Sequence, residues 1–479
     1  TPAYMREPRF AFADAVTPDY AAFKSANASR QATLFIAAND GMLHALNADN
    51  GQEMWAYVPK PVMPNLYKLA DVNYASKHVY FVDGSPQLMD VFDGSAWKTI
   101  LVGGFNSGAR GYYALDVTDP LNPKALWEFC HDSTICAISD TDMGLSYSNP
   151  VITKRPSDSK WVVLVTSGYN NVSPGTGRGY LFVLDALTGA VLEKVDTGAG
   201  NTTTPSGLGR IAVWADSANV NNTGRFVYAG DLRGNLWRFD LTVSPTAVLK
   251  IAELKDSSGR PQSITTKPEL GLVKGNRTVF VGTGRYLGTS DLQDPATWVP
   301  ASTDAWQQSI YAIKDKSVAY GNIRAGGTLI QQTISVVSPT LRSTSTNPVD
   351  WTAYDGWYAD FNPANDSPGE RVSIDPQLLL GTLLVATNVP NADACTIGGD
   401  SWQYQFSYET GQYLSTSPNQ AVAEKLSNAI TVGIVVVRLR AGPLKDIATA
   451  AGSTKNNFGV NSSGSSASGK RTGWRELIR

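Results

Sequence analysis

The residues whose types and spacing come closest to a metal site lie in the loop before the segment FVYAGD, residues 226–231. Ser217, Asn219 and Asn221 alternate along this loop, as the oxygen ligands of a hard cation such as calcium do in tight loops. The position that would close the ligand shell carries Arg225, whose guanidinium repels a cation and can occupy its place. A loop held by asparagine side-chain hydrogen bonds is the favoured interpretation, and a calcium site is the alternative.

Enzymatic chemistry has little support elsewhere in the chain. The three histidines, His44, His78 and His131, are far apart in the sequence, which leaves few arrangements for a general base or a zinc site. No Gly-x-Ser-x-Gly motif marks a nucleophilic serine. Aspartates recur at the places where a carboxylate caps a tight turn, namely Asp40, Asp93, Asp116, Asp119, Asp185, Asp231 and Asp240. We therefore predict no catalytic residues and no enzyme.

The cysteines are few and leave two interpretations. FCHDSTIC places Cys130 and Cys136 six residues apart across a polar turn. A small disulfide loop formed in an oxidising compartment is favoured over two reduced thiols. Cys395 then has no partner and is expected to be a small buried hydrophobic residue.

Composition favours an all-β fold. The 479 residues include 43 glycines, 26 prolines and 10% aromatic residues, but only 17% charged residues, as in chains of many short strands joined by turns. The net charge of −2 comes with scattered basic residues, so we predict no nucleic-acid partner. The longest apolar run, residues 430–437, is too short for a transmembrane segment of about 20 residues.

A repeated unit organises the chain. Six segments share an apolar strand, a glycine turn, a second strand resembling Leu-x-Ala-Leu-Asp, and a closing strand, and most are preceded by a further strand. Four strands per unit, repeated at about 45 residues or more, are typical of the blades of a β-propeller. Six repeats are clear and seven blades are expected, with residues 316–361 as a degenerate seventh.

The expected boundaries follow from these repeats. Residues 1–30 are a lead-in from an upstream region, residues 31–440 form the propeller with an irregular insertion around 316–361, and residues 441–479 are a Gly/Ser-rich tail. The tail ends in GWRELIR, which either docks back or frays. The first repeat lacks an evident leading strand, so the late run AITVGIVVVRLR, residues 429–440, either completes that unit or packs outside it.

Two insertions are candidate contact loops, residues 286–308 and 316–361. Their aromatic residues suit the centre of a protein interface, although filling the edges of blades explains them equally well. These candidate interface aromatics are Trp298, Trp306, Trp351 and Trp357, together with Tyr358.

One repeat resembles a family of enzymes. DGMLHALNADNGQEMW, residues 40–55, is similar to the docking repeats of pyrroloquinoline-quinone dehydrogenases, which are propellers in which such a tryptophan packs between neighbouring blades. Those dehydrogenases carry two adjacent cysteines beside the quinone, and this sequence has none. The resemblance therefore implies a quinoprotein-like fold and not redox catalysis.

Phrases along nearly the whole chain resemble a second family, the propeller region of the PilY/PilC proteins, which are tip-associated biogenesis factors and adhesins of bacterial type IV pili. They include ANDGMLHALNADNGQEMWAYVP, GARGYYALDVTDP, YAGDLRGNLWRFDL, GERVSIDPQLLLG and the terminal WRELIR. The resemblance is specific because it includes turns and phrases outside the repeat.

This second resemblance implies an exported protein of a Gram-negative bacterium, in the periplasm, at the outer membrane surface or at the pilus tip. Its implied partners are the minor pilins of the tip complex and a host or abiotic surface. Its implied role is to support pilus assembly against retraction, twitching motility and attachment. The family also implies a large N-terminal region upstream of TPAYMREPRF, where this sequence starts.

The only cofactor that the resemblance implies is calcium, because in some members the loop before YAGD binds it. Here Ser217, Asn219, Asn221 and Arg225 stand where acidic ligands are expected. No Arg-Gly-Asp tripeptide supports integrin binding. The alternatives to a pilus module are a periplasmic quinoprotein-like cofactor-binding enzyme and a propeller that serves as an envelope assembly scaffold.

Overall fold

The computed structural model describes residues 2–288, 291, 307–363, 369–391, 398–438, 444–450 and 455–459. The chain divides into two compact units, each described below by itself. Unit 1 holds Thr1–Val227 and Phe239–Val248, and unit 2 holds Tyr228–Arg238 and Leu249–Arg479.

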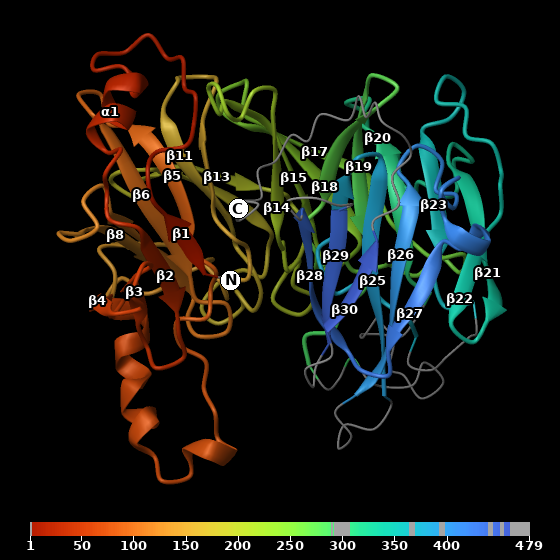
Figure 1. The fold of residues 1–479 in the computed structure, drawn as a ribbon, viewed down its shortest axis with the longest axis horizontal. Helices are drawn as coiled ribbons and strands as arrows, with labels where there is room; N and C mark the ends of the chain where they lie inside the picture. The colour runs from red at the N-terminus through yellow and green to blue at the C-terminus, as the bar shows by residue number, and fades with distance from the viewer. Residues whose placement is uncertain are drawn as a thin grey trace. The chain divides into compact units, whose positions relative to one another are not determined.

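Strands dominate the described residues of both units (Figure 1). The one α-helix among them is α1 (Tyr20–Ala26), which begins where the Asp19 side chain accepts a hydrogen bond from the backbone N–H of Ala22 at 2.8 Å. The described chain has no helix long and apolar enough to cross a membrane.

The first sheet of unit 1 takes its leading strand from the start of the chain. Its strands, in spatial order, are β1 (Ala3–Met5), β2 (Thr33–Ala37), β3 (Leu43–Asn47) and β4 (Glu53–Tyr57). β1 pairs antiparallel with β2, with Ala3 opposite Phe35. The suggestion that the late run AITVGIVVVRLR completes this unit is therefore wrong, because residues of the expected lead-in already occupy that edge.

Two further sheets complete the regular part of unit 1. The second contains β5 (Gln87–Phe92), β6 (Trp97–Gly104), β7 (Gly111–Asp116), β8 (Lys124–Cys130) and the short parallel strand β9 (Ile138–Ser139). The third contains β10 (Val151–Lys154), β11 (Trp161–Thr166), β12 (Tyr180–Asp185) and β13 (Val191–Asp196).

The boundary between the units runs through a fourth sheet, which has four strands. Its strands, in order, are β14 (Ile211–Ala215), β15 (Gly224–Gly230), β16 (Asn235–Asp240) and β17 (Ala247–Glu253).

Unit 2 contains two more groups of four strands within one ten-stranded sheet. One group is β18 (Glu269–Val273), β19 (Asn276–Gly282), β20 (Ser309–Lys314) and β23 (Gly356–Asp360). The other is β24 (Gln377–Leu379), β25 (Thr382–Pro390), β26 (Gly399–Ser407) and β27 (Ala423–Ser427). With the four sheets above, these groups confirm the six repeats found in the sequence.

Residues 316–361 do not form a four-stranded sheet of their own. They supply β23 and a hairpin of β21 (Ile330–Ser338) and β22 (Leu341–Thr344). β21 runs parallel to β23 and β22 pairs with β27, so the hairpin joins the two groups of unit 2. The degenerate seventh repeat proposed for this segment is therefore wrong.

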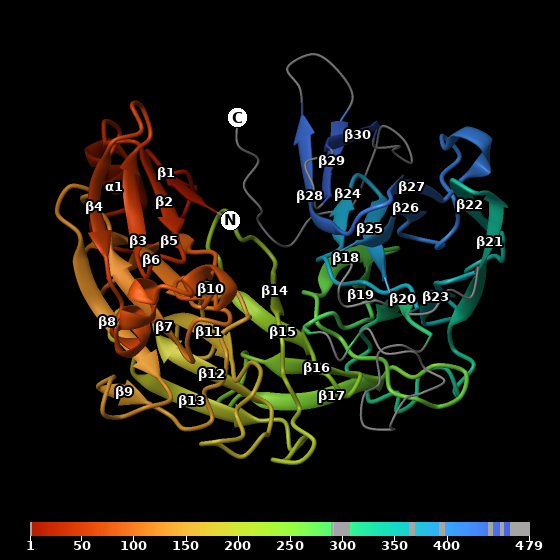
Figure 2. The same cartoon turned by 90° about the horizontal axis from the view of Figure 1, so that it is seen from below.

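The late apolar run forms a separate three-stranded sheet of β28 (Thr431–Arg438), β29 (Leu444–Ala450) and β30 (Lys455–Gly459). β28 and β29 run side by side in Figure 2. Two of these strands lie within the segment expected to be a Gly/Ser-rich tail, while the terminal GWRELIR lies outside the described residues.

Sheet stacking explains why the middle strands are apolar on both faces. Every residue of β11 is buried, whereas the outer strand β13 has only one buried residue, Val195, and is otherwise half-buried or exposed. In unit 1, side chains of the second and third sheets form one core cluster that includes Ile100, Phe129 and Phe182. Each sheet thus buries both of its faces only with the help of its neighbours, as in repeat architectures.

Tryptophans near the ends of the repeats dock one sheet on the next. Trp55 on β4 donates to the carbonyl of Pro120 at 2.7 Å, in the turn between β7 and β8. Trp127 on β8 donates to the carbonyl of Ala186 at 3.0 Å, in the turn after β12. A Cβ at Gly189 would lie 2.6 Å from the Trp127 ring, so glycine leaves the space that the indole occupies. These contacts confirm the packing role expected for the tryptophan of the repeat.

Candidate functional site

The loop 216–225, the calcium-type candidate, lies between β14 and β15. Its backbone is used internally, because the carbonyl of Ser217 accepts from the N–H groups of Val220 (3.0 Å), Asn221 (3.0 Å) and Asn222 (3.2 Å). The side chain of Asn221 accepts from the N–H of Thr223 at 3.1 Å. This pattern is a polar turn closed by its own hydrogen bonds.

The start of the chain also binds this loop. The N–H of Ala11 donates to the carbonyl of Asn219 at 2.9 Å, and the N–H of Ala13 donates to the carbonyl of Val220 at 2.9 Å. Two carbonyl oxygens that a hard cation could otherwise use are therefore already hydrogen-bonded.

Arg225 pairs with Asp216, one residue outside the alternating register. Its guanidinium lies 2.9 Å from Asp216 Oδ2, and Trp214 donates to Oδ1 of the same carboxylate at 2.9 Å. Calcium needs about six to eight oxygen ligands, several of them anionic, and the loop's only carboxylate is already paired with a cation. The residues of this loop do not fit a calcium site, because Arg225 supplies the positive charge.

The neighbouring Asp231, in YAGD, is a structural carboxyl. It is fully buried and accepts from the N–H groups of Arg233 and Asn235, both at 2.9 Å. It also accepts from Asn235 Nδ2 at 2.8 Å and Trp237 Nε1 at 3.0 Å. Desolvation outweighs these hydrogen bonds and raises the pKa of Asp231. The group caps a hairpin turn and has no open face for a substrate.

Cys130 and Cys136 form a disulfide at the end of β8, with their Cα atoms 5.8 Å apart. The loop inside it is ordered by Asp132, whose side chain accepts from the N–H of Thr134 at 2.8 Å. Cys395 lies outside the described residues.

The candidate interface tryptophans that the structure describes are core residues. Trp357 is fully buried and donates to the carbonyl of Tyr408 at 3.1 Å, and its ring fills the space above Gly411. Trp351 is 5% exposed and donates to the carbonyl of Glu409 at 2.8 Å. The interpretation of these two as exposed contact residues is wrong, and the alternative that they fill the edges of blades holds. Trp298 and Trp306 lie outside the described residues.

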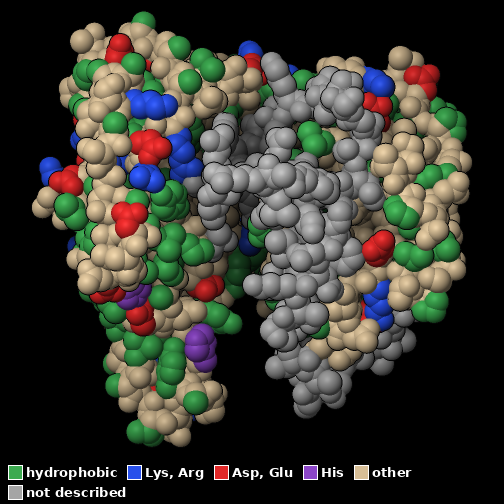
Figure 3. Space-filling view, viewed as in Figure 1, with side chains coloured by type: hydrophobic (Ala, Val, Ile, Leu, Met, Phe, Trp, Pro, Cys, Tyr) green, Lys and Arg blue, Asp and Glu red, His purple; other side chains and the backbone are tan. Residues whose placement is uncertain are grey.

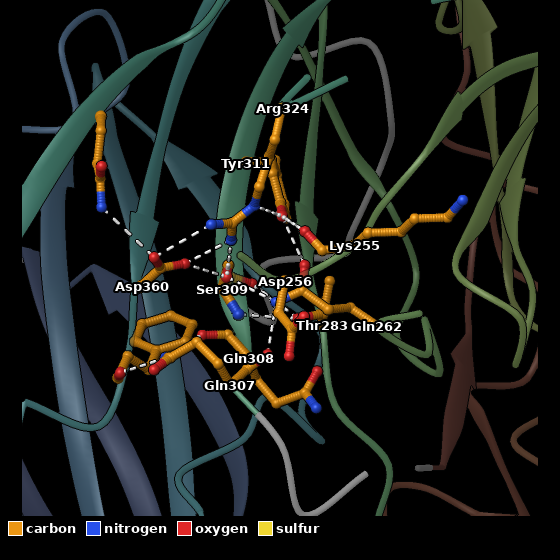
Figure 4. Close-up of polar contacts among 12 residues, drawn as sticks. Lys255, Asp256, Gln262, Thr283, Gln307, Gln308, Ser309, Tyr311, Arg324 and Asp360 are labelled. Atoms are coloured by element: carbon orange, nitrogen blue, oxygen red, sulfur yellow. Dashed lines mark hydrogen bonds and ion pairs between the residues drawn. The ribbon is translucent and has the colours of Figure 1, made fainter. Parts of the chain in front are cut away.

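Sequence reasoning missed a polar cluster in unit 2 that centres on Arg324 (Figure 4). The guanidinium donates to both oxygens of Asp360, at 2.5 and 3.1 Å, to Ser309 Oγ at 2.7 Å and to Tyr311 Oη at 2.7 Å. It also lies over the Tyr358 ring, with 4.3 Å between its carbon and the ring centroid.

Two side chains that contact Arg324 are themselves held by hydrogen bonds with Gln262. Tyr311 donates to Gln262 Oε1 at 2.5 Å, and Gln262 Nε2 donates to Ser309 Oγ at 2.8 Å and to the carbonyl of Gln307 at 2.6 Å. Desolvation lowers the pKa of Arg324, but the interactions with Tyr311 and Asp360 outweigh it. The net shift of the pKa is upward, so the guanidinium stays charged. Burial raises the pKa of Tyr311 far above its usual range. The cluster holds no free base or nucleophile and acts as a clamp between β20, β23 and the turn at Arg324.

A second buried ion pair holds the β21–β22 hairpin. Arg342 Nη1 lies 2.6 Å from Glu370 Oε2, and its guanidinium stacks 3.6 Å from the centroid of the Trp402 ring. Glu370 also accepts from Tyr404 at 2.9 Å and from Thr387 at 2.5 Å. Glu370 lies in the phrase GERVSIDPQLLLG, but no spacing rule links that phrase to residue 342.

No group of three or more His, Cys, Asp or Glu side chains in the described residues is arranged to hold a metal ion. One hollow in unit 2 has a volume of about 20 Å³ and is lined by Gln403, Gln405, Glu424 and neighbouring residues. That volume holds about one water molecule.

Comparisons with known proteins identify the family and the fold of this chain. Residues 9–347 match the family model of the PilY1 beta-propeller domain. The type IV pilus biogenesis factor PilY1 of Pseudomonas aeruginosa is 33% identical over 436 residues, a match that covers 82% of this chain and 36% of that protein. A PilY1 homolog of Xylella fastidiosa is 34% identical over 404 residues, covering 82% of this chain and 30% of that protein. The chain thus spans about a third of the length of these relatives.

A solved structure extends the similarity to the fold. The crystal structure of the PilY1 C-terminal domain of Pseudomonas aeruginosa superimposes with a TM-score of 0.74 at 26% identity. The match covers 95% of this chain and 99% of that domain.

Proposed function

Since this chain belongs to the PilY1 β-propeller family, we propose that it is a non-enzymatic module of type IV pilus biogenesis. The observation that carries the proposal is the match of residues 9–347 to the family model, together with relatives named as pilus biogenesis factors. The module acts outside the cytoplasm, in the periplasm, at the outer membrane surface or at the pilus tip, and supports pilus assembly against retraction, twitching motility and attachment.

The way the polar groups are used supports a binding role over a catalytic one. Asp231, Glu370 and Asp360 all accept hydrogen bonds from fixed protein donors. Stacked sheets held by such clamps form a rigid scaffold, which suits binding because little order remains to be gained when a partner docks. The proposed partners are the minor pilins of the tip complex, and attachment to a host or abiotic surface would use the same exposed faces.

The proposal is tested in the source bacterium by deleting the coding segment for these 479 residues and measuring surface pilin released by shearing, with twitching zones as a second readout. We expect both to fall to the level of a strain that lacks the pilus assembly motor, and to recover when the segment is restored. Normal surface piliation after the deletion would contradict the proposal.

A second test asks whether calcium affects the binding of this chain to its proposed partner. Because Arg225 already neutralises Asp216, we expect binding of the 479-residue chain to the assembled minor-pilin complex to be the same with millimolar calcium and with chelator. Binding that disappears on chelation would mean that the interpretation of Arg225 as excluding calcium from this loop is wrong.

A further inference from the structure

Between β4 and β5 the chain makes a long insertion, residues 59–80, which we call the basal segment. It contains two 3-10 helices, η1 (Lys60–Ala70) and η2 (Tyr74–Ser76). Figure 1 shows it projecting beyond the strand ends of the first sheet, at the lower left. Connections in compact domains usually span about four to six residues, and much longer ordered ones are often functional.

Hydrogen bonds fix both ends of the basal segment on unit 1. At its start, Glu128 Oε1 accepts from Tyr57 Oη at 2.7 Å and from the N–H of Lys60 at 2.8 Å. At its end, the N–H of Phe81 donates to Asn39 Oδ1 at 3.0 Å. The segment is therefore tied to the second and the first sheet.

The inner side of the segment packs on the core. Val62 is fully buried, and Leu66 and Leu69 pack against the core cluster that contains Phe35 and Tyr113. Leu66 sits directly over Gly41 in the turn between β2 and β3, where an added Cβ would lie 2.3 Å from Leu66 Cδ2. This side of the segment needs no further partner.

The outer side exposes apolar side chains that nothing in the described chain covers. The exposed fractions are 47% for Met63, 74% for Tyr67, 96% for Val72 and 47% for Tyr80. Other large hydrophobic residues exposed to this degree in the described chain are valines and leucines, so its exposed tyrosines and methionine all lie here. Figure 3 shows hydrophobic side chains along the same projection. Tyrosine and methionine are enriched in the cores of protein interfaces.

The charge of the segment indicates what covers it. It carries Lys60, Lys68 and Lys77 against one acid, Asp71, in a chain whose net charge is −2. Asp71 pairs with Lys77 at 3.6 Å, and Lys60 and Lys68 have no ion pair within the described residues. A complementary face therefore presents carboxylates beside apolar side chains.

We propose that the outer side of the basal segment is a docking surface for a protein partner whose face is apolar and acidic. The inference rests on the proposed function, because the partner is taken to be a component of the pilus tip complex. Tyr67 and Val72 fill its apolar centre, and Lys60 and Lys68 flank it. Because both ends of the segment are already fixed, binding costs little conformational entropy.

The test measures binding of the 479-residue chain to the assembled minor-pilin complex by biolayer interferometry. The first variant is Tyr67→Ser with Val72→Ser. The matched control is Val336→Ser with Val337→Ser, two exposed valines (55% and 53%) at the tip of the β21–β22 hairpin. The second variant is Lys60→Glu with Lys68→Glu. Unfolding midpoints are measured for all variants, and we expect them to stay close to the parent because the substituted side chains are exposed, except for the half-buried Lys68.

Three results together would support the proposal. The first variant should weaken binding at least tenfold, and the control should leave binding unchanged. The lysine variant should weaken binding and also reduce its dependence on salt. Unchanged binding by both variants overturns the docking surface but leaves the proposed function standing. If the control variant loses binding instead, the contact lies on the β21–β22 hairpin, and the proposed docking surface is overturned. No binding by the parent overturns both proposals.

A membrane is the competing occupant, since lysines and tyrosines also suit an anionic lipid surface. The same variants are therefore sedimented with phosphatidylglycerol vesicles. If the parent binds vesicles, and the first variant loses vesicle binding but not pilin binding, the protein-docking proposal is overturned.

Discussion

Two insertions in this chain use their aromatic side chains in opposite ways. In unit 2, residues 316–361 carry Trp351 and Trp357, whose indoles donate to backbone carbonyls and are almost completely buried. In unit 1, the basal segment carries Tyr67, which is 74% exposed. Aromatic content therefore does not mark an interface. An aromatic side chain is buried when a neighbouring sheet offers it a carbonyl to bind and a space to fill, such as the one above Gly411.

The largest expected difference between the two insertions is in the free energy of unfolding when one aromatic side chain is removed. Trp357→Ala is expected to lower the free energy of unfolding by about 3–5 kcal/mol, because it leaves a cavity and an unpaired carbonyl in the core. Tyr67→Ala is expected to stay within about 0.5 kcal/mol of the parent, because its ring is exposed. Urea denaturation followed by tryptophan fluorescence measures both. Similar costs for the two variants would break the comparison.

Ion pairs in the two insertions are expected to differ in the same direction. Arg342→Met should cost about 3 kcal/mol, because it leaves Glu370 buried without its cation. Lys77→Met removes an exposed partner of Asp71 and should cost less than about 1 kcal/mol. The double variant Arg342→Met with Glu370→Met should recover part of the loss, because it removes the unpaired charge but leaves the hydroxyls of Tyr404 and Thr387 without their acceptor. Denaturation midpoints that fall further in the double variant would refute this account.

The anchoring of the basal segment can be tested with two glycines of the first sheet. Gly41→Ala is expected to cost about 1–2 kcal/mol, through strain at its φ of 97° and displacement of Leu66. Gly51→Ala has a similar positive φ of 77° but meets nothing within 4 Å, so it measures the strain alone. Hydrogen exchange of residues 59–80 should accelerate in the first variant and not in the second. Equal exchange in both would mean that Leu66 does not hold the segment.

The smallest expected effect is a pH dependence beside the same turn. His44 lies between Glu53 (Nδ1 to Oε2, 2.5 Å) and Asp40 (Nε2 to Oδ2, 2.8 Å). Desolvation lowers the pKa of His44, but the hydrogen bonds and charges of these two carboxylates raise it further, so the net shift is upward.

A raised folded-state pKa means that the stabilisation by His44 is fully present below the unfolded pKa of about 6.5 and is lost as pH rises through the folded pKa. We expect the parent to lose a few tenths of a kcal/mol more than His44→Gln between pH 6 and 9, measured by urea titration. A parent that gains stability relative to His44→Gln over that range would reverse the assigned sign.

Much of the fold could be predicted from the sequence because its signals are local. The glycine turns, the apolar middle strands and the docking tryptophans each lie within about 45 residues of one another, so six repeats were visible. Strands that do not follow the repeat pattern were not predicted. The leading strand of the first sheet, Ala3–Met5, is too short to be recognised, and β21 and β22 follow no repeat spacing.

The candidate site was predicted less well, because exposure and pairing depend on distant residues. That Arg225 excludes a cation from its loop stays a prediction, and its partner Asp216 belongs to no pattern that the sequence singled out. Tyr67 and Val72 belong to no motif, so composition gave no reason to single them out.

The repeating strands and the family resemblance can be recognised from the amino-acid sequence alone, because each of them is set by residues close together in the chain. Only the tertiary structure decided that Trp357 is buried, that Arg342 reaches Glu370, and that the basal segment turns Met63 and Tyr67 outward. Those outcomes depend on which carbonyl, carboxylate or glycine another strand brings within contact distance, and no local pattern encodes that choice.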